Sequence, residues 1–358
     1  MKYFHWISRA VDLVHLLKYN THMDKHTSLV KTLPVLFLFI FFWAYGLAQA
    51  FPDSRKDGRY IQVNGAKLWV VTVGKGDPLF IIPGGPGGNH FGYRRFDSLA
   101  PHNMIVYFDA FGRGKSDTAR NVREYSLDRD IEDLEGLRKA LRLGQINVLG
   151  HSYGGLVAQG YALRYPQYVK HLILANTFHS FIMWQENDDN CNREIKTNYP
   201  EIWDSLMKIR ERGAVSSDKI HQALYSRVPY GFLYAYNPDN FRSRGITTTG
   251  QTQSPEQQPY PHAFNSDLYY QMVGKDGDFI VGSDIGNFDF RSQLKELKMP
   301  VLIYGGRYDR VAVPEMMIKY KEYCPQARFV IFEYSGHNPQ VEEPGRLFPL
   351  LNEFLNGP

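Results

Sequence analysis

One serine stands in a pattern that fits a catalytic nucleophile. Residues 150–154 read Gly-His-Ser-Tyr-Gly with Ser152 at the centre, and another glycine follows. An apolar run typical of a buried strand, 146–149, precedes the motif, and a helical pattern over 155–165 follows it. A tight strand-to-helix turn leaves no room for side chains beside the serine, lifts Oγ above the sheet and sets it at a helix N-terminus. The pattern predicts that Ser152 attacks an acyl group.

A serine nucleophile needs a general base, and the base needs an acid that orients it. In this strand–turn–helix setting the acid and the histidine follow the serine in that order along the chain. Asp309 comes just after the apolar run 301–304, and His337 comes just after the run 329–332. Of the 12 histidines, only His337 follows the last predicted strand in a Gly-His turn. We predict that His337 is the base and that Asp309 orients it.

Two backbone N–H groups should bind the carbonyl oxygen as it becomes an anion. The residue after the nucleophile, Tyr153, is expected to supply one of them. The loop 83–88 reads Pro-Gly-Gly-Pro-Gly-Gly, and its bare backbone can approach a ligand closely. We predict Gly85 as the second donor, the alternative being a tight turn that needs glycine only for positive φ.

The elements that must position these residues alternate between strands and helices. Segments 59–63 and 67–73 flank Asn64-Gly65, a strong signal for a β-hairpin. Continuous apolar runs, typical of strands buried on both faces, occupy 79–82, 104–108, 146–149, 172–175, 301–304 and 329–332. Helical patterns cover 127–143, 155–165 and 314–323. This alternation predicts an α/β fold with a doubly wound, mostly parallel sheet.

The alternation stops between about 178 and 288. This segment is rich in Trp, Tyr and Asn, has helix-like pieces such as 200–212, and contains a polar stretch at 236–261. We interpret 178–288 as an inserted, mainly helical lid domain, and 51–177 with 289–358 as the core. A chain of 358 residues is long enough for this arrangement.

The first 50 residues form a separate segment. A basic flank, the short apolar stretch 35–43 and the small-x-small sequence Ala48-Gln49-Ala50 together are typical of a secretory signal peptide. The apolar stretch is shorter than the roughly 20 residues of a membrane span, so we expect cleavage after Ala50, export to the periplasm or beyond, and no stable membrane insertion afterwards. An uncleaved anchor is the alternative. Translation could begin at Met1 or at Met23.

Composition narrows the classes of partner. The chain is 43% apolar and 22% charged, as in ordinary globular proteins, and its net charge of +4 is not gathered in a basic run, so no nucleic-acid partner is expected. Residues 114–116 read Gly-Lys-Ser like the end of a phosphate-binding loop, but position 109 is Asp109 where that motif needs glycine, so no nucleotide is expected. Cys191 and Cys324 could form one disulfide in an exported protein or be unrelated.

Taken together, these motifs resemble the prolyl iminopeptidase branch of the α/β-hydrolase-fold serine peptidases, which includes the tricorn-interacting aminopeptidase. The resemblance runs from about Arg59 to Leu355 and is weak only through the lid. It rests on residues 63–65, 84–87, 108–116, 150–155, 306–309 and 335–337. It implies the α/β-hydrolase fold, a triad of Ser152, Asp309 and His337, and release of an N-terminal residue, often proline, from short peptides without metal or cofactor.

Enzymes of this branch hold the free amino group of the substrate with carboxylates. The likeness of residues 272–279 puts Asp278 at such a position, with Asp276 as a weaker candidate and a solvated loop acid as the alternative. Arg310 follows Asp309 where some relatives carry glutamate, and a cation there would repel an α-ammonium group. Pro83 also stands where the branch usually has histidine.

Three functions therefore stay open: an aminopeptidase, an esterase or amidase on small acyl substrates, and a non-catalytic binding protein on the same fold. The intact set of Ser152, Asp309 and His337 argues against the third, because a decayed site usually loses one member. The fold by itself does not settle the substrate. The preferred first residue and the oligomeric state are not predicted.

Overall fold

The structure is a computed structural model that describes residues 58–238 and 264–357. The predicted signal peptide, its cleavage site and most of the polar stretch 236–261 lie outside these residues. Within the two described ranges, every helix is too short or too polar to cross a bilayer.

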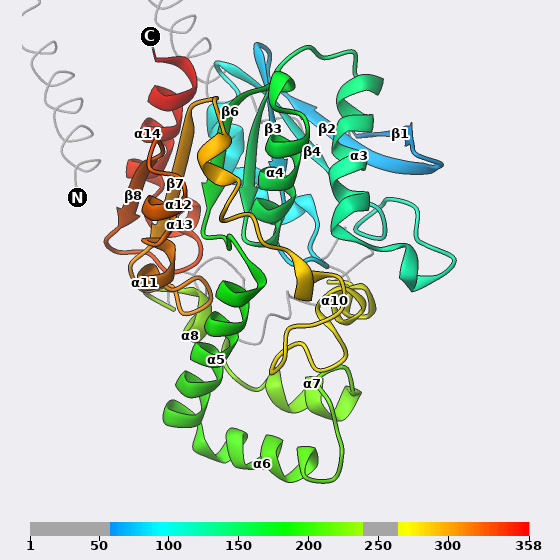
Figure 1. The fold of residues 1–358 in the computed structure, drawn as a ribbon, viewed down its shortest axis with the longest axis vertical. Coiled ribbons are helices and arrows are strands. Elements are labelled where there is room, and N and C mark those ends of the chain that lie inside the picture. The colour runs from blue at the N-terminus through cyan, green and yellow to red at the C-terminus, as the bar shows by residue number, and fades with distance from the viewer. Residues whose placement is uncertain (1–57, 239–263, 358) are drawn as a thin grey trace, which may run out of the picture. The chain divides into compact units, whose positions relative to one another are not determined.

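One eight-stranded sheet organises the described residues (Figure 1). Its strands are β1 (Arg59–Val63), β2 (Ala66–Val73), β3 (Asp77–Ile82), β4 (Asn103–Phe108), β5 (Ile146–His151), β6 (Val169–Ala175), β7 (Val301–Gly306) and β8 (Arg328–Phe332). Their spatial order is β1-β2-β4-β3-β5-β6-β7-β8. The pairs β1–β2 and β2–β4 are antiparallel, and the remaining pairs are parallel.

The antiparallel edge begins with the predicted hairpin. Val63 pairs with Ala66, and the two residues between them, Asn64 and Gly65, have φ angles of 48° and 84°. Positive φ at both central positions is the backbone of the turn that matches the twist of two antiparallel strands, and Asn-Gly is its preferred sequence. The hairpin is therefore confirmed.

Side chains alternate between two hydrophobic cores, one on each face of the sheet. Phe80 and Ile82 of β3 pack on the face covered by α3 (Leu127–Ala140) and α4 (Tyr153–Arg164). Leu79 and Ile81 of the same strand pack on the opposite face, under η1 (His90–Leu99) and α14 (Pro344–Asn356). Burial on both faces explains why the strands appear in the sequence as continuous apolar runs. The doubly wound, mostly parallel sheet is confirmed.

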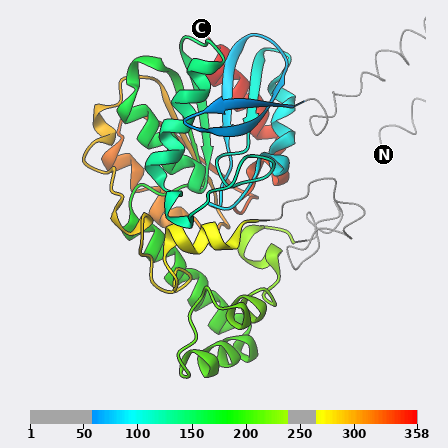
Figure 2. The same cartoon turned by 90° about the vertical axis from the view of Figure 1, so that its right-hand side faces the viewer.

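The chain leaves the sheet after β6 and returns at β7. Between them lie α5 (Phe181–Asn198), α6 (Pro200–Arg210), α7 (Lys219–Tyr225), α8 (Tyr230–Tyr234) and α10 (Ser266–Val273). Figures 1 and 2 show α5, α6 and α7 projecting from one end of the sheet, with α10 running between them and the core. This is the mainly helical insertion that the sequence predicts.

The insertion is closed at its base and has its own small core. Phe181 N–H donates to Phe288 O at 2.9 Å, and Phe290 N–H donates to His179 O at 2.9 Å, so the outgoing and returning chains pair. Beyond this closure, side chains from α5, α6 and the segment around α8 pack together, namely Cys191, Ile195, Ile202, Leu206, Val228 and Leu233. Backbone hydrogen bonds therefore join the two ends of the insertion, and the insertion has an apolar core of its own. Both features fit a separate lid.

Two expectations need correction. The predicted helix over 314–323 is two short helices, α11 (Pro314–Met317) and α12 (Tyr320–Tyr323), because the N–H groups of Lys319, Lys321 and Glu322 bond three residues back and tighten the turn. The disulfide alternative is wrong: Cys191 and Cys324 are both buried free thiols.

The remaining short elements are η2 (Val122–Glu124), η3 (Pro166–Tyr168), η4 (Ile285–Asn287), η5 (Leu294–Glu296) and α13 (Pro339–Glu342).

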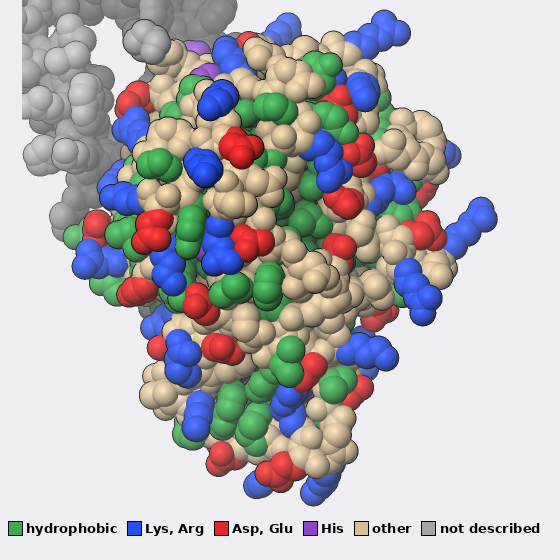
Figure 3. Space-filling model, in the orientation of Figure 1, with side chains coloured by type: hydrophobic (Ala, Val, Ile, Leu, Met, Phe, Trp, Pro, Cys, Tyr) green, Lys and Arg blue, Asp and Glu red, His purple; other side chains and the backbone are tan. Residues whose placement is uncertain are grey.

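The surface in Figure 3 carries both signs of charge side by side. Lys and Arg side chains alternate there with Asp and Glu over the core and over the lid helices. The face seen in Figure 3 therefore offers little long-range attraction to a polyanion.

Candidate active site

Ser152 occupies the turn between β5 and α4 in a strained conformation. Its φ of 54° and ψ of −126° lie in a region that side-chain-bearing residues rarely adopt. The glycines around it are required by space: a Cβ at Gly150 would lie 2.2 Å from Gly154 O, and one at Gly155 would lie 2.1 Å from Thr177 Oγ1. The Ser152 side chain makes no capping hydrogen bond to α4. Its hydroxyl is therefore held at a helix N-terminus without being used by the helix.

Asp309 and His337 form a buried hydrogen-bonded pair at the ends of neighbouring strands. Asp309 follows β7, His337 follows β8, and the two side chains are at most 4% exposed. His337 Nδ1 lies 2.8 Å from Asp309 Oδ2. Because a carboxylate accepts, Nδ1 carries the proton, and the lone pair of the neutral ring is on Nε2. This tautomer suits a general base.

The carboxylate of Asp309 is fixed from three other directions. Its Oδ1 accepts from the N–H groups of Val311 at 2.8 Å and Ala312 at 2.9 Å. Its Oδ2 also accepts from Asn176 Nδ2 at 2.8 Å. Asn176 directly follows β6 and has a φ of 45°. Sequence reasoning missed this residue, although a polar side chain at the carboxyl end of the strand next to β7 was a usable signal.

His337 lies against the nucleophile turn. The ring of His151, the residue before Ser152, is 4.7 Å from the His337 ring between centroids. His151 Nε2 lies 2.7 Å from the backbone oxygen of His337. The loop that carries His337 and the turn that carries Ser152 are thus joined directly, and the residues proposed as base and nucleophile come from adjoining segments.

The glycine loop packs against the same turn. A Cβ at Gly84 would lie 2.8 Å from Ser152 Cβ. Gly85 has a φ of 137°, and a Cβ there would meet the amide nitrogens of Gly87 and Gly88 at 2.3 and 2.5 Å. Within residues 58–238 and 264–357, the N–H groups of Gly85 and Tyr153 donate to no other residue. Both predicted oxyanion donors thus lie beside Ser152, and their N–H groups are not used in other hydrogen bonds of the described residues.

A directed chain of hydrogen bonds connects the glycine loop to His337. The His337 carbonyl can only accept, so His151 Nε2 donates to it and His151 Nδ1 accepts from the Tyr93 hydroxyl at 2.8 Å. The Tyr93 oxygen in turn accepts from Gly84 N–H at 2.7 Å. Burial, together with the nearby His337, lowers the pKa of His151 to about 3, so this ring stays neutral. Tyr93 is a second site residue that the sequence motifs did not reveal.

Asp276 and Asp278, the two acids near the end of the lid, have different partners in the structure. Asp276 forms a two-pronged ion pair with Arg210, at 2.6 and 2.7 Å, and also accepts from Ser216. Asp278 instead accepts from Tyr270 Oη at 2.9 Å, and its side chain is 12% exposed. Asp276 is therefore already used within the lid, whereas Asp278 has no arginine or lysine partner among the described residues.

A second acid lies near Asp278. Asp188, on α5, has one carboxylate oxygen, Oδ2, that is buried without a hydrogen-bond partner in the described structure. Burial, and after it the charges of Asp278 and Asp189, raise the pKa of Asp188 well above its ordinary value. Burial likewise raises the pKa of Asp278 to about 7. The charged form of both carboxyl groups is thus disfavoured by their surroundings. A cation that binds beside them would stabilise that form.

Tyr234 connects this acidic region to His337. Its ring is 5.5 Å from the His337 ring between centroids, and its backbone oxygen accepts from His337 N–H at 2.9 Å. Burial raises the pKa of its phenol well above the ordinary value, and smaller contributions come from Asp188 and Asp278. The acids of the lid therefore share a neighbourhood with the proposed base.

Arg310 is turned to the lid and neutralised there. Its Nε donates to Glu194 Oε2 at 3.0 Å, its Nη1 donates to Phe232 O at 2.8 Å, and its guanidinium stacks over the Phe232 ring at 4.7 Å. A paired guanidinium repels an approaching ammonium far less than a free one.

No group of three or more His, Cys, Asp or Glu side chains in the described ranges could hold a metal ion.

Comparisons with known proteins agree with this architecture. The family described as the α/β hydrolase fold matches residues 77–208 and 233–344. A proline iminopeptidase of Heyndrickxia coagulans is 30% identical over 283 residues, which cover 79% of this chain and 92% of the relative.

Solved structures are similar over more than four-fifths of the chain. A proline iminopeptidase of Mycobacterium smegmatis superimposes with a TM-score of 0.64 at 20% identity, covering 84% of this chain and 97% of that one. An esterase of Exiguobacterium antarcticum does so with a TM-score of 0.59 at 20% identity, covering 83% and 99%. At this identity the structures speak for the fold alone, and the predicted α/β-hydrolase fold is confirmed.

Proposed function

The chain belongs to the α/β-hydrolase-fold family and to its proline iminopeptidase branch, and on this premise we propose that it is a serine aminopeptidase that releases an N-terminal residue, often proline, from short peptides. The observation that carries the proposal is the pairing of two features. The hydrogen-bonded Asp309 and His337 adjoin the Ser152 turn, and two acids that pair with no Arg or Lys of the described residues, Asp188 and Asp278, lie nearby in the lid.

The chemistry follows from the geometry around Ser152. His337 Nε2 takes the hydroxyl proton as Ser152 Oγ bonds to the substrate carbonyl carbon. The N–H groups of Gly85 and Tyr153 receive the negative charge that develops on the carbonyl oxygen. His337 then gives its proton to the departing amine as the peptide C–N bond breaks. Water, deprotonated by His337, attacks the acyl-enzyme and regenerates Ser152.

The acids in the lid would recognise the free amino end. An N-terminal proline presents a secondary ammonium group, with one positive charge and two N–H donors. Asp278 is the principal candidate for its partner. Among the described residues no Arg or Lys pairs with its carboxylate, and His221, whose Nδ1 lies 3.9 Å from Asp278 Oδ2, stays neutral because burial lowers its pKa to about 4. Asp188 would add a second negative charge close by. Arrival of the ammonium would favour ionisation of both carboxyl groups, since an opposite charge stabilises the charged form.

The test compares three substrates at equal concentration: a prolyl arylamide, the same compound with its nitrogen acylated, and a short acyl ester. The aminopeptidase proposal expects the prolyl arylamide to have a far higher kcat/KM than its N-acylated form. Faster turnover of the N-acylated compound or of the ester would instead identify an esterase or amidase. No turnover of any of the three, combined with tight binding, would point to a binding protein.

We also propose that the protein is exported. The support is the sequence of residues 1–50, with its basic flank, short apolar stretch and Ala48-Gln49-Ala50. Cleavage after Ala50 would leave a chain that begins at Phe51, just ahead of the hairpin, with all proposed site residues intact.

A further inference from the structure

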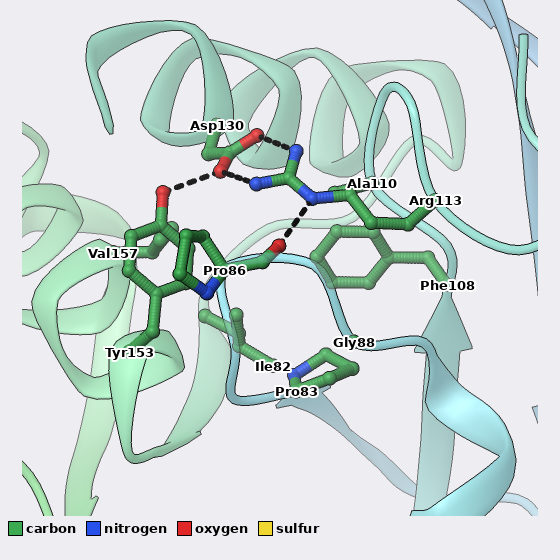
Figure 4. A pocket seen from close by; sticks show the side chains of 10 residues that line it. All are labelled: Ile82, Pro83, Pro86, Gly88, Phe108, Ala110, Arg113, Asp130, Tyr153 and Val157. Carbon is green, nitrogen blue, oxygen red and sulfur yellow. Dashed lines mark hydrogen bonds and ion pairs between the residues drawn. The ribbon is translucent and has the colours of Figure 1, made fainter. Parts of the chain in front are cut away.

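A buried ion pair lies directly behind the loop that carries Gly85. Arg113 and Asp130 are each 3% exposed, and the two Nη atoms of Arg113 donate to the two carboxylate oxygens of Asp130 at 2.7 Å each. Arg113 Nε donates to Pro86 O at 2.7 Å, and Tyr153 Oη donates to Asp130 Oδ2 at 2.5 Å (Figure 4). Pro86 follows Gly85 in the chain. One ion pair therefore contacts both segments that carry the proposed oxyanion donors.

The space around this ion pair is too small for a substrate. The cavity enclosed by Pro83, Pro86, Arg113, Asp130, Tyr153 and their neighbours has a volume of about 20 Å³. That is room for a water molecule and nothing larger. The cavity beside the ion pair in Figure 4 therefore leaves no room for the peptide, and we assign the ion pair a supporting role.

Stability alone is a poor explanation for such a pair. Two charges taken out of water cost several kcal/mol each, and well-packed apolar side chains often stabilise a core equally well. What an arginine–carboxylate pair adds is fixed geometry, because the planar guanidinium donates in set directions. Burial and the negative charge of Asp130 raise the pKa of the Tyr153 phenol well above its ordinary value, so its hydroxyl keeps the proton that it donates.

We propose that Arg113, Asp130 and the side chain of Tyr153 are positioning residues that hold the Gly85 and Tyr153 N–H groups at a fixed separation. The inference rests on the proposed function, in which these two N–H groups bind the oxyanion. Donors of this kind act only when they lie 2.7–3.1 Å from the position that the anion will take. Releasing one anchor should therefore weaken binding of the transition state more than binding of the substrate.

The helices that carry Asp130 and Tyr153, α3 and α4, also carry a matched control. On α4, Tyr161 Oη donates to Glu135 Oε2 at 2.9 Å, and Glu135 is held by Arg138 through two hydrogen bonds of 2.8 Å. This set repeats the tyrosine–carboxylate–arginine arrangement further along α3 and α4. The other hydrogen bonds of Arg138 end on the carbonyls of Leu143 and Gly144, away from the glycine loop. Tyr161→Phe and Tyr153→Phe thus remove the same kind of bond, from a buried tyrosine to a carboxylate that an arginine holds.

The experiment measures kcat and KM for a prolyl arylamide, the rate of labelling by a fluorophosphonate, and Tm for wild type, Tyr153→Phe and Tyr161→Phe. Losing a whole oxyanion donor costs about 10²- to 10³-fold in kcat, so a loosened donor should cost roughly 10-fold. We expect Tyr153→Phe to lower kcat and labelling by about 10-fold with KM within about twofold. Tyr161→Phe should lower Tm by a similar amount while kcat and labelling stay at the wild-type level.

Equal kcat and equal labelling for the two variants would overturn the positioning role while leaving the proposed function intact. A wild-type protein that is not labelled at Ser152 would instead overturn the proposed function, and with it this inference. The other anchor is tested by Arg113→Lys, which keeps the charge beside Asp130 but has one nitrogen in place of the three that reach Pro86 O and the two Asp130 oxygens. It should show the same loss of kcat at unchanged KM, and wild-type kcat in a folded Arg113→Lys variant would contradict the proposal.

Discussion

Replacing Asp278 with asparagine removes one negative charge and leaves an oxygen that can still accept from Tyr270. If Asp278 pairs with the ammonium of the substrate, the lost contact is charge-assisted and largely desolvated, since its side chain is only 12% exposed. Such a contact is worth roughly 1.5–3 kcal/mol, or about 10- to 150-fold in binding. At pH 8, where a carboxyl of pKa about 7 is ionised, kcat/KM for a prolyl arylamide should fall by this factor.

The assay sets that substrate against a short acyl ester, which offers no cation. We expect turnover of the ester by Asp278→Asn to stay within about twofold of wild type. Equal losses on both substrates would mean that the substitution damaged the lid. Unchanged turnover of both would place the ammonium at another group, with Asp188→Asn as the next variant to measure.

Asp278→Asn should lower activity on the prolyl arylamide but raise the stability of the folded protein at pH 8. The unfolded carboxyl loses its proton near its ordinary pKa of 3.8, whereas the folded one keeps it to about pH 7. The stability contributed by this group is therefore fully present below pH 3.8 and is lost as the pH rises to about 7. The shift corresponds to at most roughly 4 kcal/mol, so Asp278→Asn should be more stable than wild type at pH 8 and equal to it at pH 3.5.

Asp276→Asn is the matched control two residues away. It breaks the ion pair with Arg210, so it should lower Tm at pH 8 and should not favour one substrate over the other. A stabilised Asp276→Asn, or a destabilised Asp278→Asn at pH 8, would contradict the assigned difference between the two acids.

Three further outcomes are expected. Fluorophosphonate should label the protein once, Ser152→Ala should abolish the labelling, and its kcat should fall on the order of 10⁶-fold; persistent labelling would exclude Ser152 as the nucleophile. Asn176→Ala removes one of the bonds to Asp309 Oδ2 and should lower kcat by roughly 10-fold, in line with about 1–1.5 kcal/mol for a buried hydrogen bond, with KM unchanged. N-terminal sequencing of the exported protein should begin near Phe51, whereas an intact residue 1 or 23 would refute cleavage.

Sequence alone went furthest where a feature is encoded within a few neighbouring residues. The hairpin at Asn64-Gly65 is encoded by two residues that tolerate positive φ. The turn at Ser152 is encoded by glycines whose missing side chains leave room for the backbone. Asp309 and His337 could be chosen because each lies within about five residues of the end of a strand, and parallel strands bring their carboxyl ends to one edge of the sheet.

Contacts between distant segments needed the tertiary structure. Asn176, Tyr93 and Asp188 belong to no motif, and they join the site only because folding brings β6, η1 and α5 to it. The choice between Asp276 and Asp278 depended on which carboxylate Arg210 occupies, 66 residues away along the chain. The pairing of the two cysteines was equally open, because spacing along a chain does not determine distance in space.

The ion pair behind the glycine loop shows the same division. Arg113 was part of a recognised motif, yet its partners Asp130, Pro86 and, through Asp130, Tyr153 come from three other segments. Residue type and local spacing determined which atoms could do acyl transfer, because backbone sterics and strand order act over short stretches. Only packing decided which charges are paired, which are left for a substrate, and which N–H groups are held in place, because those are properties of side chains that meet after the chain has folded.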